Sequence, residues 1–241
     1  MLNRRHVHAG LAGFALLGGS LLALPGVASA AARSQSRPHS VAGNQALLES
    51  QLTSRAAELA RLSTDVTGAT TLTLAHTAAL KASIASATSN IDTLIAKVPH
   101  DTTFAELKAD RASMLKENRV FAVLAPQVFL TIEADGIGAQ VATFQANESS
   151  LQGSVNSLVG QHGYTNALHH YVAFVKAVNV ANEAASNVTS AVLAQTPADY
   201  PGDTGIFVRS NRALLKADLA LAHASYDESV IGLASGGYTG A

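Results

Sequence analysis

The stretch that decides the fold class is LTIEADGIGAQVATFQANESSLQGSVNSL (residues 130–158). Apolar residues recur along it at alternating gaps of four and three residues, and one member of the series, Glu148, is polar. The series is Leu130, Ala134, Ile137, Val141, Phe144, Glu148, Leu151, Val155 and Leu158. A repeat that averages about 3.5 residues and continues this long is typical of a helix whose narrow apolar stripe packs against a partner helix.

This pattern predicts one helix over residues 126–159, whose 34 residues would extend about 50 Å. Phe144 is expected to be fully buried in the middle of its stripe. Glu148 lies in the same stripe, so we expect its carboxylate to reach a basic partner or solvent, because an unpaired buried charge is costly.

The same gaps recur before and after this stretch. The further series are Leu48, Leu52, Leu59, Leu62 and Val66; Leu80, Ile84, Ala87, Ile91, Leu94 and Val98; Tyr171, Phe174, Val178, Ala181, Ala185, Val188 and Val192; and Leu215, Leu219, Ala222, Tyr226, Val230 and Leu233. No stretch shows the two-residue alternation of a half-buried strand. The sequence therefore predicts an all-α, elongated, antiparallel, coiled-coil-like bundle of five or six helices over residues 44–235, followed by a flexible tail at 236–241.

Residues that start and stop helices separate these series. Thr103 and Glu106 have the spacing of a capping box. Pro126 fits either the first turn of a new helix or a kink in a continuing one. Residues 160–163 (GQHG) predict a turn, and residues 195–202, with two prolines, predict the one long connection.

Composition excludes several classes of protein. The 241 residues include no cysteine, which excludes disulfide scaffolds, zinc–thiolate sites and thiol catalysis. Lys and Arg number 16 against 17 Asp and Glu, and there is no Trp. A near-neutral chain with few aromatic rings is a poor candidate for binding nucleic acid, which requires phosphate neutralisation and base stacking.

The first 30 residues have the pattern of a secretory signal peptide. Two arginines, Arg4 and Arg5, precede an apolar stretch over residues 11–24, and small residues at 27–30 follow a Pro-Gly pair. We expect cleavage near Ala30 or Ala32, with an uncleaved membrane anchor as the alternative, and export by the Sec or the twin-arginine route. Residues 31–43 then read as a polar linker. No stretch after Ala30 is expected to span a bilayer, so the mature protein is expected outside the cell or in its envelope.

Three blocks resemble a known family. They are LTLAHTAAL (residues 72–80), DTTFAELKADRASMLKENRVFAVLAPQVFLTIEAD (residues 101–135) and TPADYPGDTGIFVRSNRALLKADLALAHASYDE (residues 196–228). The sequence resembles a family of exported, Ala- and Leu-rich helical proteins of high-GC Gram-positive bacteria. That family shows an aromatic residue before Arg119 and a lysine after Pro126, where this chain has Asn118 and Gln127. The resemblance implies an exported helical protein and supplies no catalytic residues.

The residues that could bind a metal or act in catalysis are better explained by structural roles. His169 and His170 are adjacent and point about 100° apart, so we expect solvated surface histidines whose joint replacement leaves stability unchanged. His223 and Asp227 are four residues apart, as in a common surface pair. Glu106 also lies four residues from a second acid, Asp110, with Lys108 and Arg111 close enough in sequence to solvate both. No di-iron, nucleotide-loop or hydrolase motif is present, so we expect no metal, no cofactor and no enzymatic activity.

The segment around residues 120–130 is apolar on every face, which favours burial on several sides or a binding surface. The candidate interaction patch is Arg119, Phe121, Leu124, Phe129 and Tyr200. The preferred hypothesis is an exported, non-catalytic structural or interaction protein whose partner is a protein or an envelope component. The alternative is a helical-bundle binding module for an apolar ligand or lipid, with weak membrane contact. A cavity of a few hundred Å³ near this segment would favour the alternative.

Overall fold

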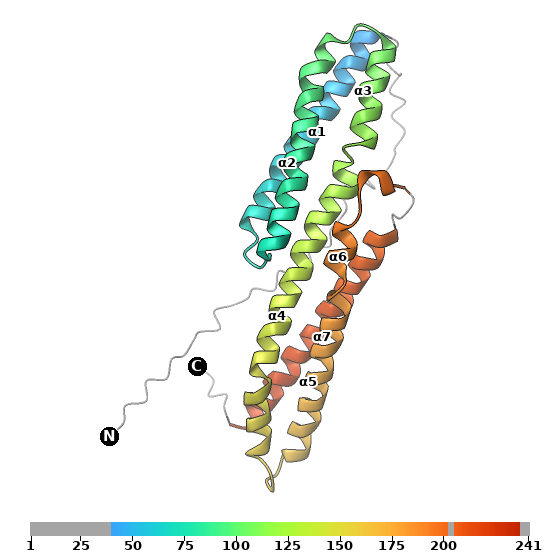
Figure 1. The fold of residues 1–241 in the computed structure, drawn as a ribbon. Helices are drawn as coiled ribbons and strands as arrows, with labels where there is room; N and C mark the ends of the chain where they lie inside the picture. The colour runs from blue at the N-terminus through green and yellow to red at the C-terminus, as the bar shows by residue number, and fades with distance from the viewer. Residues whose placement is uncertain (1–39, 202–204, 237–241) are drawn as a thin grey trace, which may run out of the picture. The chain divides into compact units, whose positions relative to one another are not determined.

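The structure, a computed structural model, describes residues 40–201 and 205–236 (Figure 1). These residues form helices and turns without any strand, so the predicted all-α bundle is confirmed. The five longest helices are α1 (Val41–Gly68), α2 (Leu74–Lys97), α4 (Ala125–Asn156), α5 (Tyr164–Ala185) and α7 (Gly205–Ala234). Two shorter helices are α3 (Phe104–Lys116) and α6 (Val188–Leu193). Short 3₁₀ turns cover Val98–His100 and Pro197–Asp199, and a π-helix covers Val120–Leu124.

The predicted signal peptide (1–30) and residues 237–241 of the predicted tail lie outside the described residues. The predicted linker, 31–43, extends three residues too far, because α1 already begins at Val41. Ser40 is its N-cap, and the Ser40 hydroxyl accepts a hydrogen bond from the backbone N–H of Gly43. This side-chain cap satisfies one of the free N–H groups that begin any helix.

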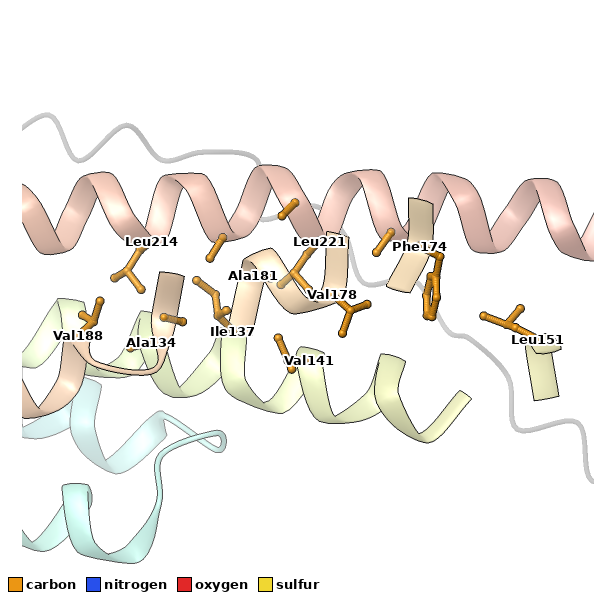
Figure 2. Packing of buried hydrophobic residues seen from close by; sticks show 14 of the residues in the cluster. Ala134, Ile137, Val141, Leu151, Phe174, Val178, Ala181, Val188, Leu214 and Leu221 are labelled. Carbon is orange, nitrogen blue, oxygen red and sulfur yellow. The ribbon is translucent and has the colours of Figure 1, made fainter. Parts of the chain in front are cut away.

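The buried apolar residues form two clusters, and α4 contributes to both. The N-terminal cluster joins α1, α2, α3, the π-helix and the first turn of α4, as far as Val128. The C-terminal cluster joins α4 from Leu130 onward to α5, α6 and α7. Figure 2 shows residues of the C-terminal cluster, with Leu214 and Leu221 lying between α7 and α4.

The predicted stripe of α1 is confirmed at every position: Leu48, Leu52, Leu59, Leu62 and Val66 are buried. The long stripe of α4 is confirmed except near its centre. Phe144 is only half-buried and packs edge-on against the fully buried Phe174 of α5, with ring centroids 5.7 Å apart. Glu148 forms no salt bridge with a basic residue within the described part of the chain; it is half-buried and accepts a 3.4 Å hydrogen bond from the Tyr171 hydroxyl. Burial, with the charge of Glu148, raises the pKa of Tyr171.

The predicted stripe of the last helix is wrong. Leu215, Leu219, Tyr226 and Leu233 are each about 60% exposed. The buried face of α7 is instead Ser210, Leu214, Ala217, Ala220, Leu221, Ala224, Asp227 and Ile231. α7 therefore has an exposed face of large apolar residues and a buried face on which Leu214, Leu221 and Ile231 alternate with small residues, and the buried face packs on α5. Small side chains let two helices approach closely, and this packing decides which face is buried.

A predicted turn and a predicted capping box are confirmed. The turn between α4 and α5 contains Gly160 and Gly163, whose φ angles of 81° and 103° are favourable for glycine and strained for other residues. The capping box before α3 is also present. Thr103 Oγ1 accepts from the backbone N–H of Glu106, and the Glu106 carboxylate accepts from the backbone N–H groups of Thr102 and Thr103. These hydrogen bonds lower the pKa of Glu106.

Asp110 does not lie in the predicted environment of Lys108 and Arg111. It is buried, and Oδ1 accepts a 2.5 Å hydrogen bond from Nζ of Lys97 at the end of α2. The buried Oδ2 atoms of Asp110 and Asp101 have no hydrogen-bond partner among the described residues. Burial, and then the nearby carboxyl group of Asp110, raise the pKa of Asp101.

Replacing Asp101 with asparagine is expected to stabilise the protein at neutral pH. A raised pKa means that the folded state prefers protonated Asp101, so stability declines as pH rises from the ordinary value of 3.8 through the raised one. The Asp101→Asn amide stays neutral and can donate to Asp110. Thermal melts should show the variant above the wild type at pH 7, with the difference shrinking toward pH 4. A variant that melts below the wild type at pH 7 would contradict the proximity of the two carboxyl groups.

One stretch of the described chain, Phe104–Asn156, is long and apolar enough by length and composition to cross a membrane, whereas the sequence predicted none after Ala30. Within its most apolar window, 56% is buried inside the protein. The core helix of a soluble protein passes the same test. The stretch is also interrupted between Lys116 and Val120, where α3 ends and the π-helix begins.

Candidate functional site

The chain changes helix type just before Pro126. α3 ends at Lys116, and in the following π-helix the N–H groups of Leu124 and Ala125 donate to carbonyls five residues back, those of Arg119 and Val120. Pro126 has no N–H to donate, so a regular turn could not continue across this point. π-Helical turns inside longer helices are frequent at functional sites.

Arg119 connects the π-helix to the segment that follows α6. Its Nε donates a 2.9 Å hydrogen bond to the carbonyl of Pro197. Its guanidinium lies over the ring of Tyr200, 4.3 Å from the ring centre. A cation placed over an aromatic face is attracted by the ring's electron density. The sequence grouped Arg119 and Tyr200 in one patch, and the structure brings these two into contact.

Gln127, eight residues further along, makes a second connection. Its Nε2 donates to the carbonyls of Val192 at 3.0 Å and Gln195 at 2.7 Å. The last carbonyls of a helix have no partner within the helix, so Gln127 caps the C-terminal end of α6. Together, Arg119 and Gln127 hold residues 192–197 against the π-helix.

A cavity of about 460 Å³ lies between α2, the π-helix region and the segment after α6. Its α2 wall is made of small or short polar side chains, and its floor of buried residues. The lining is Ala82, Ser83, Ser86, Ala87, Asn90, Glu117, Asn118, Arg119, Val120, Val123, Leu124, Gln127, Leu193, Gln195, Thr196 and Pro197. Its volume lies within the range of about 300–1,000 Å³ that small-molecule sites occupy.

The side chain of Asn118 is the unusual group in this lining. It is 3% exposed, and neither its amide nitrogen nor its amide oxygen finds a hydrogen-bond partner in the described part of the chain. An unpaired buried polar group costs about 1–3 kcal/mol. Asn118 is therefore a buried asparagine of the cavity lining whose amide nitrogen and oxygen are both unpaired and have almost no accessible surface.

The other residues of the predicted patch do not join one surface. Leu124 is buried in the N-terminal cluster and lines the cavity. Phe121 is half-exposed, with the Arg55 guanidinium 5.4 Å from its ring centre, and burial lowers the pKa of Arg55. Phe129 is half-buried under the Arg61 guanidinium at 4.9 Å. The arginines over these two rings both belong to α1, so the predicted patch divides into a part that contacts α1 and the cavity.

The histidine predictions are partly wrong. His169 is exposed, as expected, but His170 is mostly buried, and its Nδ1 lies 2.7 Å from Oδ1 of Asp227. Asp227 thus pairs across helices with His170, whereas the sequence pattern offered His223. Within residues 40–201 and 205–236, no group of three or more histidine, aspartate or glutamate side chains could hold a metal ion.

A second histidine–aspartate pair was missed. His76, in the first turn of α2, places Nδ1 2.8 Å from Oδ2 of Asp135 on α4. Asp135 also accepts a hydrogen bond from the backbone N–H of Thr73, the N-cap of α2. The pair fixes the start of α2 against α4, and it lies outside the cavity lining.

The two amides of the cavity were also missed as site residues. Gln127 lies within the apolar run of residues 120–130, whereas Asn118 lies in the polar stretch KENR (residues 116–119) that precedes it. A polar amide inside an apolar run is the signal that could have identified Gln127, and no local pattern distinguishes Asn118. No protein-family model, no curated protein and no solved structure matches this chain, so the resemblance remains a prediction.

Proposed function

We propose that the protein is an exported, non-catalytic binding protein that holds a small, uncharged molecule in the cavity beside the π-helix. The observation that carries the proposal is the buried side chain of Asn118, whose amide nitrogen and oxygen are both unpaired. A bound ligand that pairs with both atoms would remove the cost of this unpaired group. Export remains a prediction from residues 1–30.

The lining supports a ligand with a polar edge and an apolar body. Val120, Val123 and Leu124 give the cavity an apolar floor, while Asn118 offers one donor and one acceptor side by side. A cyclic amide, or any group that carries N–H beside C=O, complements that pair. This chemistry is more specific than the apolar ligand or lipid that the sequence suggested for the same segment.

The charged groups of the lining do not favour an anionic ligand. Arg119 is the one basic residue of the lining, and its guanidinium is already engaged with Pro197 and Tyr200. Glu117 carries the opposite charge beside it. The arginine therefore acts as a positioning residue that holds the 193–197 wall, and the ligand it encloses is uncharged.

Replacing Asn118 with leucine is expected to stabilise the ligand-free protein by about 1–3 kcal/mol, because the unpaired amide is removed at similar volume. Chemical denaturation checks this. Asn166→Leu is the matched control, since Asn166 is exposed on α5 and should change stability by less than about 0.5 kcal/mol. Destabilisation by Asn118→Leu, with no effect of the control, would mean that Asn118 has a structural partner.

Binding is tested with 2-pyrrolidone, a five-membered ring with adjacent N–H and C=O groups, and with cyclopentane as its apolar counterpart. NMR of the ¹⁵N-labelled protein should show 2-pyrrolidone shifting the Asn118 side-chain signals, and Asn118→Leu should lose the interaction. Equal binding of cyclopentane would favour an apolar-ligand site. Native mass spectrometry of the protein from its own producer should then show a bound small molecule; a bare chain together with no response to 2-pyrrolidone would contradict the proposal.

A further inference from the structure

The large-residue face of α7 forms an exposed apolar stripe. Its members are Val208, Leu215, Leu219, Ala222, Tyr226 and Leu233. The large members are between 52% and 63% exposed. The opposite face of α7 packs on α5 and α4, so no helix of the described bundle covers the stripe.

The positions of the stripe follow the seven-residue repeat of a coiled coil. The gap from Leu215 to Leu219 is four, from Leu219 to Ala222 three, and from Ala222 to Tyr226 four, while Val208 and Leu233 each lie seven residues beyond. A helix that places apolar residues at these gaps is suited to pack against another helix along its length. Residues 208–233 extend about 38 Å at 1.5 Å per residue.

The stripe is also symmetric in sequence. Val208 and Leu233, Leu215 and Tyr226, and Leu219 and Ala222 are three pairs centred on one point, between Ala220 and Leu221. If a second copy of the helix lies antiparallel across that point, each member of the stripe faces another member. Such two-fold pairing, in which one surface meets the same surface of the other copy, is the commonest symmetry of soluble oligomers.

We propose that α7 is the interface of an antiparallel homodimer with its two-fold axis between Leu219 and Ala222. In this arrangement Arg212, the charged member of the repeat, lies opposite the small hydroxyl side chain of Ser229. At the flanks, Asp218 lies beside Ser225 of the second copy, so two acids do not meet. This symmetry favours a second copy of the chain as the partner, because binding to an unrelated helix would not require a symmetric stripe.

The size of the stripe fits a reversible dimer. Five large side chains that are each more than half exposed present roughly 500 Å² per copy, which is near the upper range for apolar patches on monomers. Two copies would together bury about 1,000 Å², at the lower end of specific interfaces. We therefore expect a dissociation constant of about 1–100 μM.

Sedimentation of the full chain across this concentration range tests the proposal. The wild type should change from monomer to dimer, and Leu219→Glu should weaken dimerisation at least about tenfold while leaving the circular dichroism spectrum unchanged. The control is Leu74→Glu at the start of α2, where the leucine is 90% exposed and lies outside the stripe. A monomeric wild type, or a dimer that Leu219→Glu leaves intact, would overturn the proposal.

Cross-linking tests how the two α7 helices are aligned. The chain has no cysteine of its own, so only the introduced cysteines can form a disulfide. A mixture of the Leu219→Cys and Ala222→Cys variants should form a disulfide-linked heterodimer on mild oxidation. Each variant alone should cross-link several-fold less, because residue 219 faces residue 222 of the other copy. Preferential linkage of Leu219→Cys with itself would indicate parallel helices and would overturn the antiparallel arrangement. This test does not depend on the cavity or its ligand.

Discussion

Replacing Phe174 with alanine is expected to lower the free energy of unfolding by about 3–5 kcal/mol. Phe174 is 1% exposed and lies within the C-terminal cluster between α4 and α7 (Figure 2). Removing its ring deletes the largest fully buried side chain of the described residues and leaves a cavity that the surrounding helices cannot fill. Urea denaturation of the wild type and the variant measures the difference.

Phe144→Ala is the matched control, because Phe144 is the edge-on neighbour of Phe174 but is only partly buried. Its loss should cost about 1–2 kcal/mol, from partial burial and the ring contact. The sequence alone predicted that Phe144 would be fully buried. If Phe144→Ala proves more damaging than Phe174→Ala, the packing of α4 against α5 differs from that in the structure.

Replacing His170 with alanine is expected to cost about 3 kcal/mol, the second large effect. The side chains of His170 and Asp227 are 18% and 10% exposed, and removing one partner leaves a largely buried carboxylate without its hydrogen bond. The ring of His170 also packs edge-on against Tyr226, with centroids 5.8 Å apart. Thermal and chemical melts should both detect the loss.

His169→Ala is the control for this prediction. His169 is adjacent to His170 but exposed, so its replacement should hardly change the free energy of unfolding. A double-mutant cycle with Asp227→Asn then isolates the pair, and a coupling energy of about 0.5–3 kcal/mol is expected for residues in contact. Additive effects of the two substitutions would show that the histidine and the aspartate do not interact in solution.

The apolar repeat was sufficient to predict α1 but misleading for α7. In α1, the large apolar residues lie on one face, so Leu52, Leu59 and Leu62 could only be the buried side. In α7, two faces compete, and the protein buries the one with Ala217, Ala220 and Ala224. A pattern that weights large residues selects the other face, because it does not register how closely small residues let α5 approach.

The candidate site was only partly predictable for a different reason. The apolar segment after Arg119 drew attention to this region, and Arg119 and Tyr200 were both predicted as members of one patch, although their contact was not predicted. Asn118 became recognisable only once α2 and residues 193–197 were seen to line a cavity with it. Such enclosure depends on contacts between distant parts of the chain, such as the hydrogen bond from Gln127 to Val192, which no local pattern encodes.

The passage of α4 through both apolar clusters has a consequence for how the protein loses its structure. Val128 belongs to the N-terminal cluster and Leu130 to the C-terminal one, so the two meet within a single helical turn. Melting of either half would break backbone hydrogen bonds of the helix that the other half packs on. We therefore expect the described helices to unfold as one cooperative unit, in which a disturbance beside the cavity reaches the α5–α7 pair through the continuous hydrogen-bonded backbone of α4.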